Sequence, residues 1–319
     1  MTATQTNNSE VVIDIIDLTK DYEVGFLKKR KVRALDGLKL QVRRGEIFGF
    51  LGPNGAGKTT TLKLLMRLIY PTKGSARILG RPIDEVSTRA RVGYLPENPY
   101  FYDYLSGREL LEYTAALFGV PAEQARLKGK ELLGLVGLDS DRANRQLRKY
   151  SKGMLQRIGI AQALVNDPEI VFMDEPMSGL DPIGRREVRD LLLSLRAQGK
   201  TVFFSSHILS DVEALCDRAA ILSRGKLVRC GTVHELTGIE DPAVEVVALG
   251  IDASALDRFS HAISSLQSAS TTPNGVHLVL GDEGEIDDAL ALIREYGGKL
   301  VSVNPRRASL EDIFADTNG

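Results

Sequence analysis

Residues 52–60 combine the glycines, the lysine and the threonines that a phosphate-binding loop requires. They fit the pattern G-x-x-x-x-G-K-[ST], in which glycines let successive backbone N–H groups point at phosphate oxygens. Lys58 is predicted to reach the β- and γ-phosphates of a nucleotide, and the Thr59 hydroxyl to bind Mg²⁺. The alternative is a glycine-rich turn that binds nothing. The predicted nucleotide-binding segment is Gly52, Pro53, Asn54, Gly55, Ala56, Gly57, Lys58, Thr59 and Thr60.

Two carboxylates and a histidine follow apolar segments later in the chain. Asp174 and Glu175 come after the apolar run that begins at Ile170, and His207 follows a second apolar segment, Thr201–Ser205. Buried parallel strands read as continuous apolar runs, and open α/β sheets bind ligands at the carboxyl ends of such strands. The paired acids can instead belong to a solvated turn or a helix N-cap, and a histidine at a strand end can be structural.

The elements around the phosphate loop have the context that it needs. The apolar run Ile47–Leu51 predicts a buried strand before the loop, and the apolar spacing in Thr61–Leu68 predicts a helix after it. A strand is also expected over Val11–Leu18, closed by residues 19–22. Tyr22 there can stack on a purine if the nucleotide lies at the glycine loop, although packing alone also explains a tyrosine at a strand end.

A helical insert is expected between the phosphate loop and the paired acids. Strands are predicted over Ser75–Leu79 and from Val92 into a proline-containing loop. From Ser106 to Leu138 the apolar residues recur at helical spacing, with breaks near residues 119–121 and at Gly137. A further helix is predicted over Ile158–Val165 and ends at residues 166–168.

The last quarter of the chain predicts a separate small domain. Composition changes after residues 237–242, which suggests a domain boundary. Beyond it the predicted order is strand (244–249), helix (254–259), weak strand (262–268), strand (276–280), helix (285–296) and strand (300–303). This β-α-β-β-α-β order suggests a ferredoxin-like α+β domain, with a short final helix over Leu310–Phe314.

Composition limits the class of protein without identifying a partner. The chain has 319 residues, with 41 Lys and Arg against 42 Asp and Glu, so it lacks the basic excess of a nucleic-acid binder. Residues 1–10 are polar and are expected to form a disordered tail, and no run approaches the ~20 apolar residues of a spanning helix. Cys216 and Cys230 are expected to be buried thiols. The basic run Lys28–Arg33 is either a solvated charged loop or a contact for lipid headgroups or an acidic partner.

The order of these motifs resembles the ATP-binding cassette (ABC) ATPases across roughly residues 11–237. Residues 52–60 and 171–175 match any Walker A and Walker B pair. A serine-glycine signature before Walker B, an acid-containing loop after it and a following histidine together resemble ABC proteins alone. The segments that carry the resemblance are Gly52–Thr60, Tyr150–Met154, Val171–Glu175, Ser178–Asp181 and His207.

This resemblance implies a role for each polar residue in ATP hydrolysis. Asp174 matches the acid that holds Mg²⁺, and Glu175 matches the general base that orients the attacking water. His207 occupies the place of the switch histidine that senses the γ-phosphate. Glu97 stands where the family commonly has a glutamine that contacts the metal and the transport subunit. Its carboxylate is expected to bind Mg²⁺ in place of the glutamine, and coupling there is expected to differ from the family pattern.

The resemblance also implies a homodimer that encloses two ATP molecules. Ser151 and Gly153 match signature positions that contact the γ-phosphate of ATP on the opposite protomer, and Asp181 is expected at the seam between the protomers. The family's signature commonly reads Ser-Gly-Gly-Gln. Here Lys152 and Met154 replace one glycine and the glutamine, which places the detailed geometry of the contact in question.

The fold expected from sequence and resemblance is therefore an α/β P-loop NTPase core with an added domain. Residues 11–238 are assigned to an ABC ATPase domain, with a helical subdomain at about 97–168, and residues 243–319 to an accessory α+β domain. A chain with one cassette, no spanning segment and a small α+β domain resembles the ATPase subunits of bacterial exporters whose transmembrane permease is a separate chain. Such a subunit is peripheral, on the cytoplasmic face of the inner membrane.

Two other functions remain open from the sequence alone. One is a soluble ABC ATPase that acts on ribosomes or DNA, although neither a second cassette nor a long coiled coil is present. The other is a nucleotide-sensing module without turnover, against which the complete set Lys58, Asp174, Glu175 and His207 argues. The aromatic run at residues 100–104 falls where the family docks its membrane partner, or else packs in the core. The sequence does not identify a transported substrate.

Overall fold

The computed structural model describes residues 10–25, 30–138, 140–236, 243–252, 255–272 and 274–305, without the side chains of residues 140 and 305. The chain divides into two compact units, Met1–Val233 and His234–Gly319, called unit 1 and unit 2 below. Nearly all of the predicted tail and the predicted final helix at residues 310–314 lie outside the described residues. Within those residues, no helix has the length and apolar character that crossing a membrane requires.

Unit 1 is built on a six-stranded sheet that contains the predicted buried strands. Its order is β10-β9-β3-β8-β7-β6, in which β10 alone is antiparallel to its neighbour. Every residue of β3, β7 and β8 is buried, because both faces of the sheet are covered. The strands are β3 (Ile47–Leu51), β6 (Val92–Leu95), β7 (Ile170–Asp174), β8 (Thr201–Ser206), β9 (Arg218–Ser223) and β10 (Lys226–Thr232).

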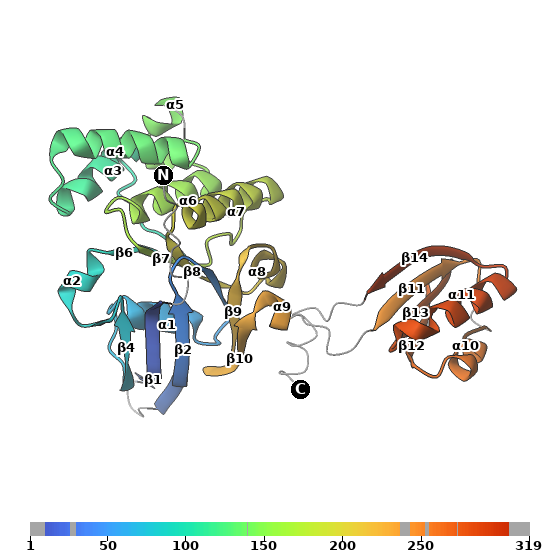
Figure 1. Ribbon diagram of the computed structural model, residues 1–319. Helices are drawn as coiled ribbons and strands as arrows, with labels where there is room; N and C mark the ends of the chain where they lie inside the picture. The colour runs from blue at the N-terminus through green and yellow to red at the C-terminus, as the bar shows by residue number, and fades with distance from the viewer. Residues whose placement is uncertain are drawn as a thin grey trace, which may run out of the picture. The chain divides into compact units, whose positions relative to one another are not determined.

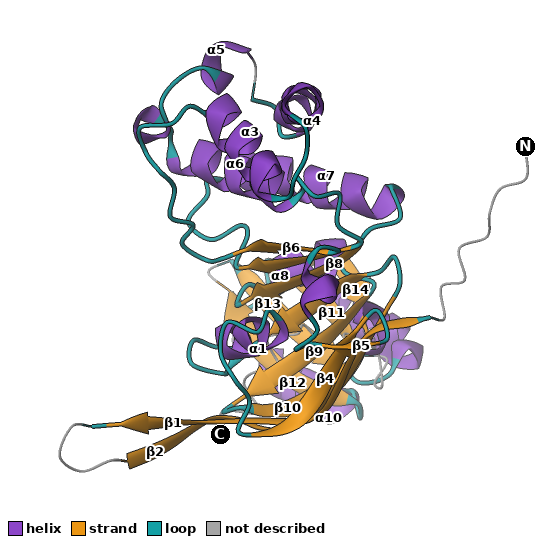
Figure 2. Ribbon diagram, turned by 90° about the vertical axis from the view of Figure 1, so that its left-hand side faces the viewer, coloured by secondary structure: helices purple, strands orange, loops and turns teal. Residues whose placement is uncertain are grey.

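A second, antiparallel sheet of order β2-β1-β4-β5 completes the core of unit 1. Its strands are β1 (Val11–Val24), β2 (Arg30–Arg43), β4 (Lys73–Ile78) and β5 (Arg81–Pro82). Helix α1 (Lys58–Leu65) contributes Leu62, Leu64 and Leu65 to one hydrophobic core that includes residues of both sheets. Strand β1 is six residues longer than predicted, because β2 pairs with it as far as Val24 and Arg30. Figure 2 shows this long pair of strands extending from the sheet.

A group of helices follows β6 and lies at one end of unit 1 (Figure 1). It contains α3 (Gly107–Leu117), α4 (Ala122–Leu135), α5 (Ser140–Ala143), η1 (Leu147–Lys149) and α6 (Lys152–Ala163), and α2 (Val86–Arg89) precedes β6. The break between α3 and α4 falls at the predicted residues 119–121. Helix α6 begins six residues before the predicted start, because Ser151 caps it by accepting a hydrogen bond from the Met154 N–H at 3.3 Å.

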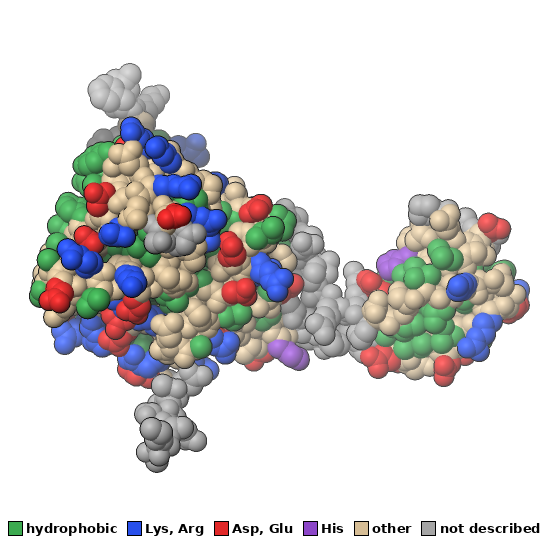
Figure 3. All heavy atoms as spheres, turned by 90° about the horizontal axis from the view of Figure 1, so that it is seen from above, with side chains coloured by type: hydrophobic (Ala, Val, Ile, Leu, Met, Phe, Trp, Pro, Cys, Tyr) green, Lys and Arg blue, Asp and Glu red, His purple; other side chains and the backbone are tan. Residues whose placement is uncertain are grey.

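On the surface over this helical end, neither positive nor negative side chains predominate. Figure 3 looks onto it and shows basic, acidic and hydrophobic side chains mixed together. The remaining helices of this part of the chain are α7 (Pro182–Ala197), α8 (Leu209–Leu215) and α9 (Val233–Leu236).

Cys216 is partly buried but Cys230 is exposed, so the prediction of two buried thiols is wrong for Cys230, which lies on the edge strand β10.

Unit 2 has its own core and the predicted order of elements. A four-stranded antiparallel sheet of order β12-β13-β11-β14 packs against two helices through Val246, Phe259, Leu278 and Ile293. The elements are β11 (Val244–Leu249), α10 (Leu256–Ala262), β12 (Leu266–Thr272), β13 (Gly275–Leu280), η3 (Glu283–Glu285), α11 (Ile286–Glu295) and β14 (Lys299–Pro305).

Candidate functional site

The phosphate loop connects β3 to α1 and has a backbone that only glycine adopts readily. Gly55 and Gly57 have φ angles of 81° and 107°, in the left-handed region that side chains disfavour. A Cβ atom on Gly57 would also lie 2.5 Å from the carbonyl oxygen of Ala34 on β2. The loop therefore turns tightly against β2 and leads directly into the N-terminus of α1, where backbone N–H groups lack helical partners.

Lys58, the first residue of α1, points back over the loop. Its ammonium group donates hydrogen bonds to the carbonyl oxygens of Gly52, at 2.7 Å, and Pro53, at 3.3 Å. It also lies 3.3 Å from Oε1 of Glu175, and only 6% of its side chain is exposed. A lysine held in this way is a fixed positive charge at the loop, as binding of a polyphosphate requires.

The two acidic residues at the end of β7 are held by a serine of the neighbouring strand. Ser205 is the register partner of Asp174, and its hydroxyl donates to Asp174 Oδ1 at 2.6 Å. The same hydroxyl accepts a hydrogen bond from the Glu175 N–H at 2.9 Å. Glu175 has a φ angle of 51°, an uncommon conformation for a residue other than glycine. Ser205 therefore stabilises this strained turn through hydrogen bonds to both acidic residues.

His207 completes a line of polar groups that starts at the phosphate loop. Its Nδ1 lies 2.8 Å from Glu175 Oε2, while the other oxygen of Glu175 faces Lys58. The histidine follows β8 and is partly exposed, whereas Glu175 is buried. Glu175 is thus fixed on both sides, by a cation from the loop and by an imidazole from the next strand.

These residues surround one cavity of about 510 Å³. The predicted site residues Lys58, Thr59, Glu97, Glu175 and His207 all line it. Gly52 and Asp174 do not line the cavity. The carbonyl oxygen of Gly52 accepts a hydrogen bond from Lys58, and Oδ1 of Asp174 accepts one from Ser205. The full lining is Ala34, Pro53, Asn54, Gly55, Ala56, Gly57, Lys58, Thr59, Thr60, Glu97, Glu175, Ser178 and His207.

The chemistry near Asp174 fits a divalent cation such as Mg²⁺. Asp174 is almost fully buried, and its Oδ2 atom has no hydrogen-bond partner, so one carboxylate oxygen is left to bind a ligand. Burial, with a smaller contribution from the negative charges of Asp174 and Glu97, raises the pKa of Tyr94 to about 12. Among the described residues, no group of three His, Cys, Asp or Glu could hold a metal alone. In proteins Mg²⁺ takes few protein ligands and shares substrate phosphates.

Tyr22 lies beside the phosphate loop on the side of the antiparallel sheet. Its hydroxyl is 3.5 Å from Oγ1 of Thr60, which lines the cavity. The ammonium of Lys20 lies 5.0 Å from the centre of the Tyr22 ring and covers one of its faces.

Tyr22 does not line the cavity itself, and three further predicted site residues lie elsewhere. Ser151 caps α6, Gly153 lies in its first turn, and Asp181 caps α7 by accepting a hydrogen bond from the Gly184 N–H at 3.0 Å. None of the three lines the cavity around the phosphate loop. Lys152, a departure from the common signature, lies over the loop that contains Asp181, since a Cβ atom on Gly179 would be 1.9 Å from its Nζ.

Sequence reasoning missed two residues that shape the site. Ser205 was predicted only as part of a strand, and Ala34 was assigned no role. Ser205 acts across the pairing of β8 with β7, and Ala34 on β2 lies against Gly57 of the phosphate loop. Their signal is the register between distant strands, which a local pattern does not contain.

Comparison with known proteins shows the family to which the chain is similar. The family described as ABC transporter matches residues 35–178. An uncharacterized ABC transporter ATP-binding protein of Nostoc sp. is 49% identical over 310 residues, covering 97% of this chain and 90% of the relative. A fluoroquinolones export ATP-binding protein of Mycobacterium tuberculosis is 34% identical over 291 residues, covering 90% of this chain and 88% of the relative.

A solved structure is similar to part of the chain. It is a dimeric ATP-binding cassette in a post-hydrolysis state, bound to ADP and Pi. The match has a TM-score of 0.64 and 26% sequence identity, and it covers 69% of this chain and 98% of the cassette.

Proposed function

Because this chain belongs to the family of ABC transporter ATP-binding proteins, we propose that it hydrolyses ATP to ADP and phosphate in order to power export through a separate membrane protein. The observation that carries the proposal is the line Lys58, Glu175 and His207 at a phosphate loop, within one cavity. A relative named for fluoroquinolone export supports the direction of transport.

Glu175 is proposed as the general base, and its contacts suggest how ATP activates it. Lys58 donates hydrogen bonds to the carbonyl oxygens of Gly52 and Pro53, and its ammonium group forms an ion pair with Oε1 of Glu175. A phosphate oxygen that contacts Lys58 must compete with one of these. Displacement of Glu175 Oε1 leaves that oxygen available to accept a proton from water, while His207 keeps the carboxylate in place through Oε2.

Asp174 and Thr59 are proposed to hold Mg²⁺, with Glu97 on the same side of the cavity. Mg²⁺ would neutralise charge on the β- and γ-phosphates of bound ATP. The unpartnered Oδ2 atom of Asp174 supports its assignment as the carboxylate ligand. Tyr22 is proposed to contact the base, because its ring lies beside Thr60 at the end of the phosphate loop.

Two copies of the chain are proposed to enclose the nucleotides. Ser151 and Gly153 lie at the N-terminus of a twelve-residue helix but do not line the cavity of their own chain, which supports the proposal that they bind a phosphate held by another copy. Asp181, at the start of α7, is proposed to lie at the seam. The dimeric state of the similar cassette supports this arrangement.

The membrane partner is proposed to dock on a tyrosine cluster formed by Tyr100, Tyr102, Tyr104 and Tyr113. Tyr100 is 97% exposed, and the ring of Tyr102 lies 6.0 Å from those of both Tyr104 and Tyr113. Exposed aromatic side chains that cluster on a surface are typical of protein contacts. Docking there would hold the chain at the cytoplasmic face of the inner membrane as a peripheral subunit.

The variant Glu175→Gln tests both the enzyme activity and the dimer. It removes the proposed base but keeps the shape of the side chain, so steady-state ATP hydrolysis should fall about 100-fold or more. The variant should still form a dimer with ATP and Mg²⁺, measured by light scattering during size-exclusion chromatography. Glu131→Gln, in an exposed ion pair on α4, is the matched control and should hydrolyse ATP normally. Normal hydrolysis by Glu175→Gln would refute the base assignment, and a monomer at every concentration would refute the dimer.

A further inference from the structure

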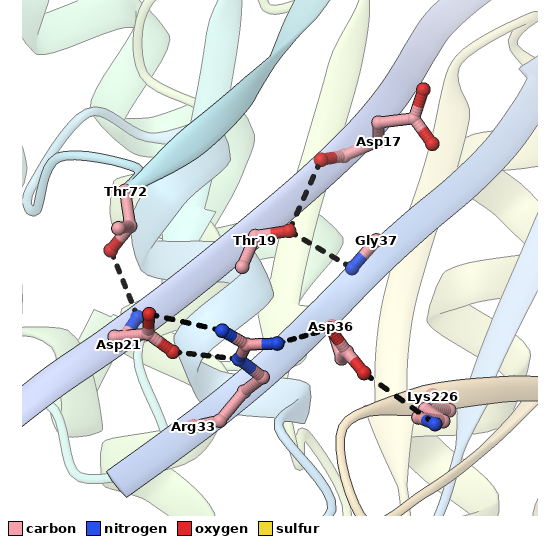
Figure 4. A network of polar contacts seen from close by, with 8 residues as sticks. All are labelled: Asp17, Thr19, Asp21, Arg33, Asp36, Gly37, Thr72 and Lys226. Atoms are coloured by element: carbon pink, nitrogen blue, oxygen red, sulfur yellow. Dashed lines mark hydrogen bonds and ion pairs between the residues drawn. The ribbon is translucent and has the colours of Figure 1, made fainter. Parts of the chain in front are cut away.

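Arg33, on β2, joins two carboxylates beside the proposed nucleotide site (Figure 4). Its Nε and Nη2 atoms donate to the two oxygens of Asp21 on β1, at 2.8 and 3.4 Å. Its Nη1 atom donates to Asp36, farther along β2, at 2.9 Å. A guanidinium group has the planar set of donors that a two-sided contact of this kind needs, whereas a lysine has not.

On one side the contact leads to the phosphate loop. The N–H of Asp36 donates to the carbonyl oxygen of Gly225 at 2.8 Å. The N–H of Gly225 in turn donates to the carbonyl oxygen of Ala56, in the phosphate loop, at 3.0 Å. Lys226 adds an ion pair with Asp36 at 3.5 Å. The position of Asp36 is therefore linked by backbone hydrogen bonds to the segment that holds the phosphates.

On the other side the contact leads to Tyr22. Asp21 precedes Tyr22 on β1, and the Asp21 N–H donates to Oγ1 of Thr72 at 2.9 Å. The pairing of β1 with β2 shifts register between Lys20 and Asp21, immediately before Tyr22, which pairs with Val32. Arg33 provides a side-chain connection across this irregular point.

Stability alone does not account for this arrangement. Arg33 is 53% exposed, and ion pairs of exposed side chains contribute little to folding. The geometry of Arg33 instead fixes the distance between β1, which carries Tyr22, and the part of β2 that is linked to the phosphate loop. Both strands are bound to the same rigid guanidinium group. The Arg33 hydrogen bond also lowers the pKa of Asp21, so this carboxylate is charged at neutral pH.

We propose that Arg33 is a positioning residue that holds Tyr22 at a fixed distance from the phosphate loop, so that the base and the phosphates of one nucleotide are bound together. The inference rests on the proposed contact between Tyr22 and the base. It assigns a function within the chain to Arg33, the last residue of the basic run Lys28–Arg33, for which the sequence suggested solvent, lipid or an acidic partner.

The test compares Arg33→Gln with Arg81→Gln, using ATP and inorganic tripolyphosphate as ligands. Arg81 lies in the same sheet, is 51% exposed and forms an ion pair with Glu85, so it is a close match. Arg33→Gln should bind Mg-ATP about fivefold more weakly. The loss is limited because the variant weakens the stacking of one base on Tyr22 without removing the tyrosine. Its affinity for tripolyphosphate, which has no base, and its unfolding midpoint should equal those of Arg81→Gln. An equal loss of affinity for both ligands would overturn the proposal.

Tyr22→Ala separates this inference from the function on which it rests. If Arg33 acts through Tyr22, Arg33→Gln should weaken ATP binding in the parent chain but not in a chain that already carries Tyr22→Ala. The same loss in both backgrounds would refute the link between the two residues. Unchanged ATP affinity in Tyr22→Ala would refute the base contact itself. Weaker binding by Tyr22→Ala but not by Arg33→Gln would overturn the positioning role alone.

Discussion

Ser205 supports both acidic residues of the site, so its hydroxyl should matter for stability and for hydrolysis. Ser205→Ala removes the donor to Asp174 and the acceptor for the Glu175 N–H, both of which are buried. Unsatisfied buried groups of this kind cost about 1–3 kcal/mol, which should appear in the free energy of unfolding by denaturant. The rate of ATP hydrolysis should also fall, because the two carboxylates lose their common support. Ser194→Ala, which removes only a local contact on α7, is the control. A parental rate and stability for Ser205→Ala would contradict this account.

Asp211, on α8, should make the chain less stable as the pH rises. Burial raises the pKa of its carboxyl group, Arg185 and Arg189 oppose that shift, and Glu175 adds to it. The folded chain thus binds this proton more tightly than the unfolded chain. The free energy of unfolding therefore falls as the pH rises from the ordinary carboxyl pKa of about 3.9 through the raised value.

Asp211→Asn removes that charge and tests the sign of the effect. The variant should have a higher free energy of unfolding than the parent at pH 7, because a buried amide costs less than a buried charge with an unpartnered oxygen. The gain should shrink as the pH falls and level off below about pH 3, where the parent carboxyl is protonated in both the folded and the unfolded chain. Denaturant unfolding at a series of pH values measures it, with exposed Asp190→Asn as the control. A variant less stable than the parent at pH 7 would show that the pairing with the arginines dominates.

At the scale of elements, local patterns predicted strands and helices where burial alone determines them. Strands β3, β7 and β8 are apolar throughout because both of their faces are covered, and their positions were predicted closely. The extension of β1 to Val24 was missed, because it depends on pairing with β2, a strand that the sequence patterns did not identify. The early start of α6 was also missed, because it depends on the Ser151 cap.

The site shows the same division between local and distant information. Lys58, Glu175 and His207 were predicted from short motifs, and the structure brings them together because β3, β7 and β8 end at one edge of the sheet. Asp174 was predicted as well, but the orientation of its free oxygen depends on Ser205. The contact between Arg33 and Asp21 joins residues twelve positions apart on paired strands. The strand register had to be known before it could be predicted.

The tyrosine cluster gives a prediction about the surface between β6 and the helices. Replacing Tyr100 and Tyr104 together by serine should reduce binding to inner-membrane vesicles that contain the partner about tenfold, because aromatic anchors contribute most of the energy of such contacts. Hydrolysis of ATP by the purified variant should be unchanged, since neither side chain lines the cavity. Leu127→Ser, on α4 and 65% exposed, is the control. Parental binding by the double variant would place the docking surface elsewhere.

At the scale of the whole molecule, the two units have separate hydrophobic cores. The core of unit 1 is formed by both of its sheets and α1, whereas that of unit 2 is formed by β11, β13 and the two helices of that unit. The proposed catalytic residues and the tyrosine cluster all belong to unit 1. The similar solved cassette is matched over almost its whole length by about two thirds of this chain, so a cassette of that size is a complete folded protein. Unit 2 is therefore expected to fold independently and to be unnecessary for the chemical step.

A chain that ends at residue 240 tests this separation, because it keeps α9 and removes the sheet and helices of unit 2. It should bind ATP and hydrolyse it at the parental rate, since every residue that lines the cavity is retained. In denaturant the full chain should show two unfolding transitions, because independent cores unfold separately. The short chain should show only the transition of unit 1. Circular dichroism and steady-state hydrolysis measure the two outcomes. If the short chain folded but hydrolysed ATP much more slowly, unit 2 would be part of the catalytic machinery. If the full chain unfolded in one step on a guanidinium gradient and the short chain failed to fold, the two cores would depend on each other.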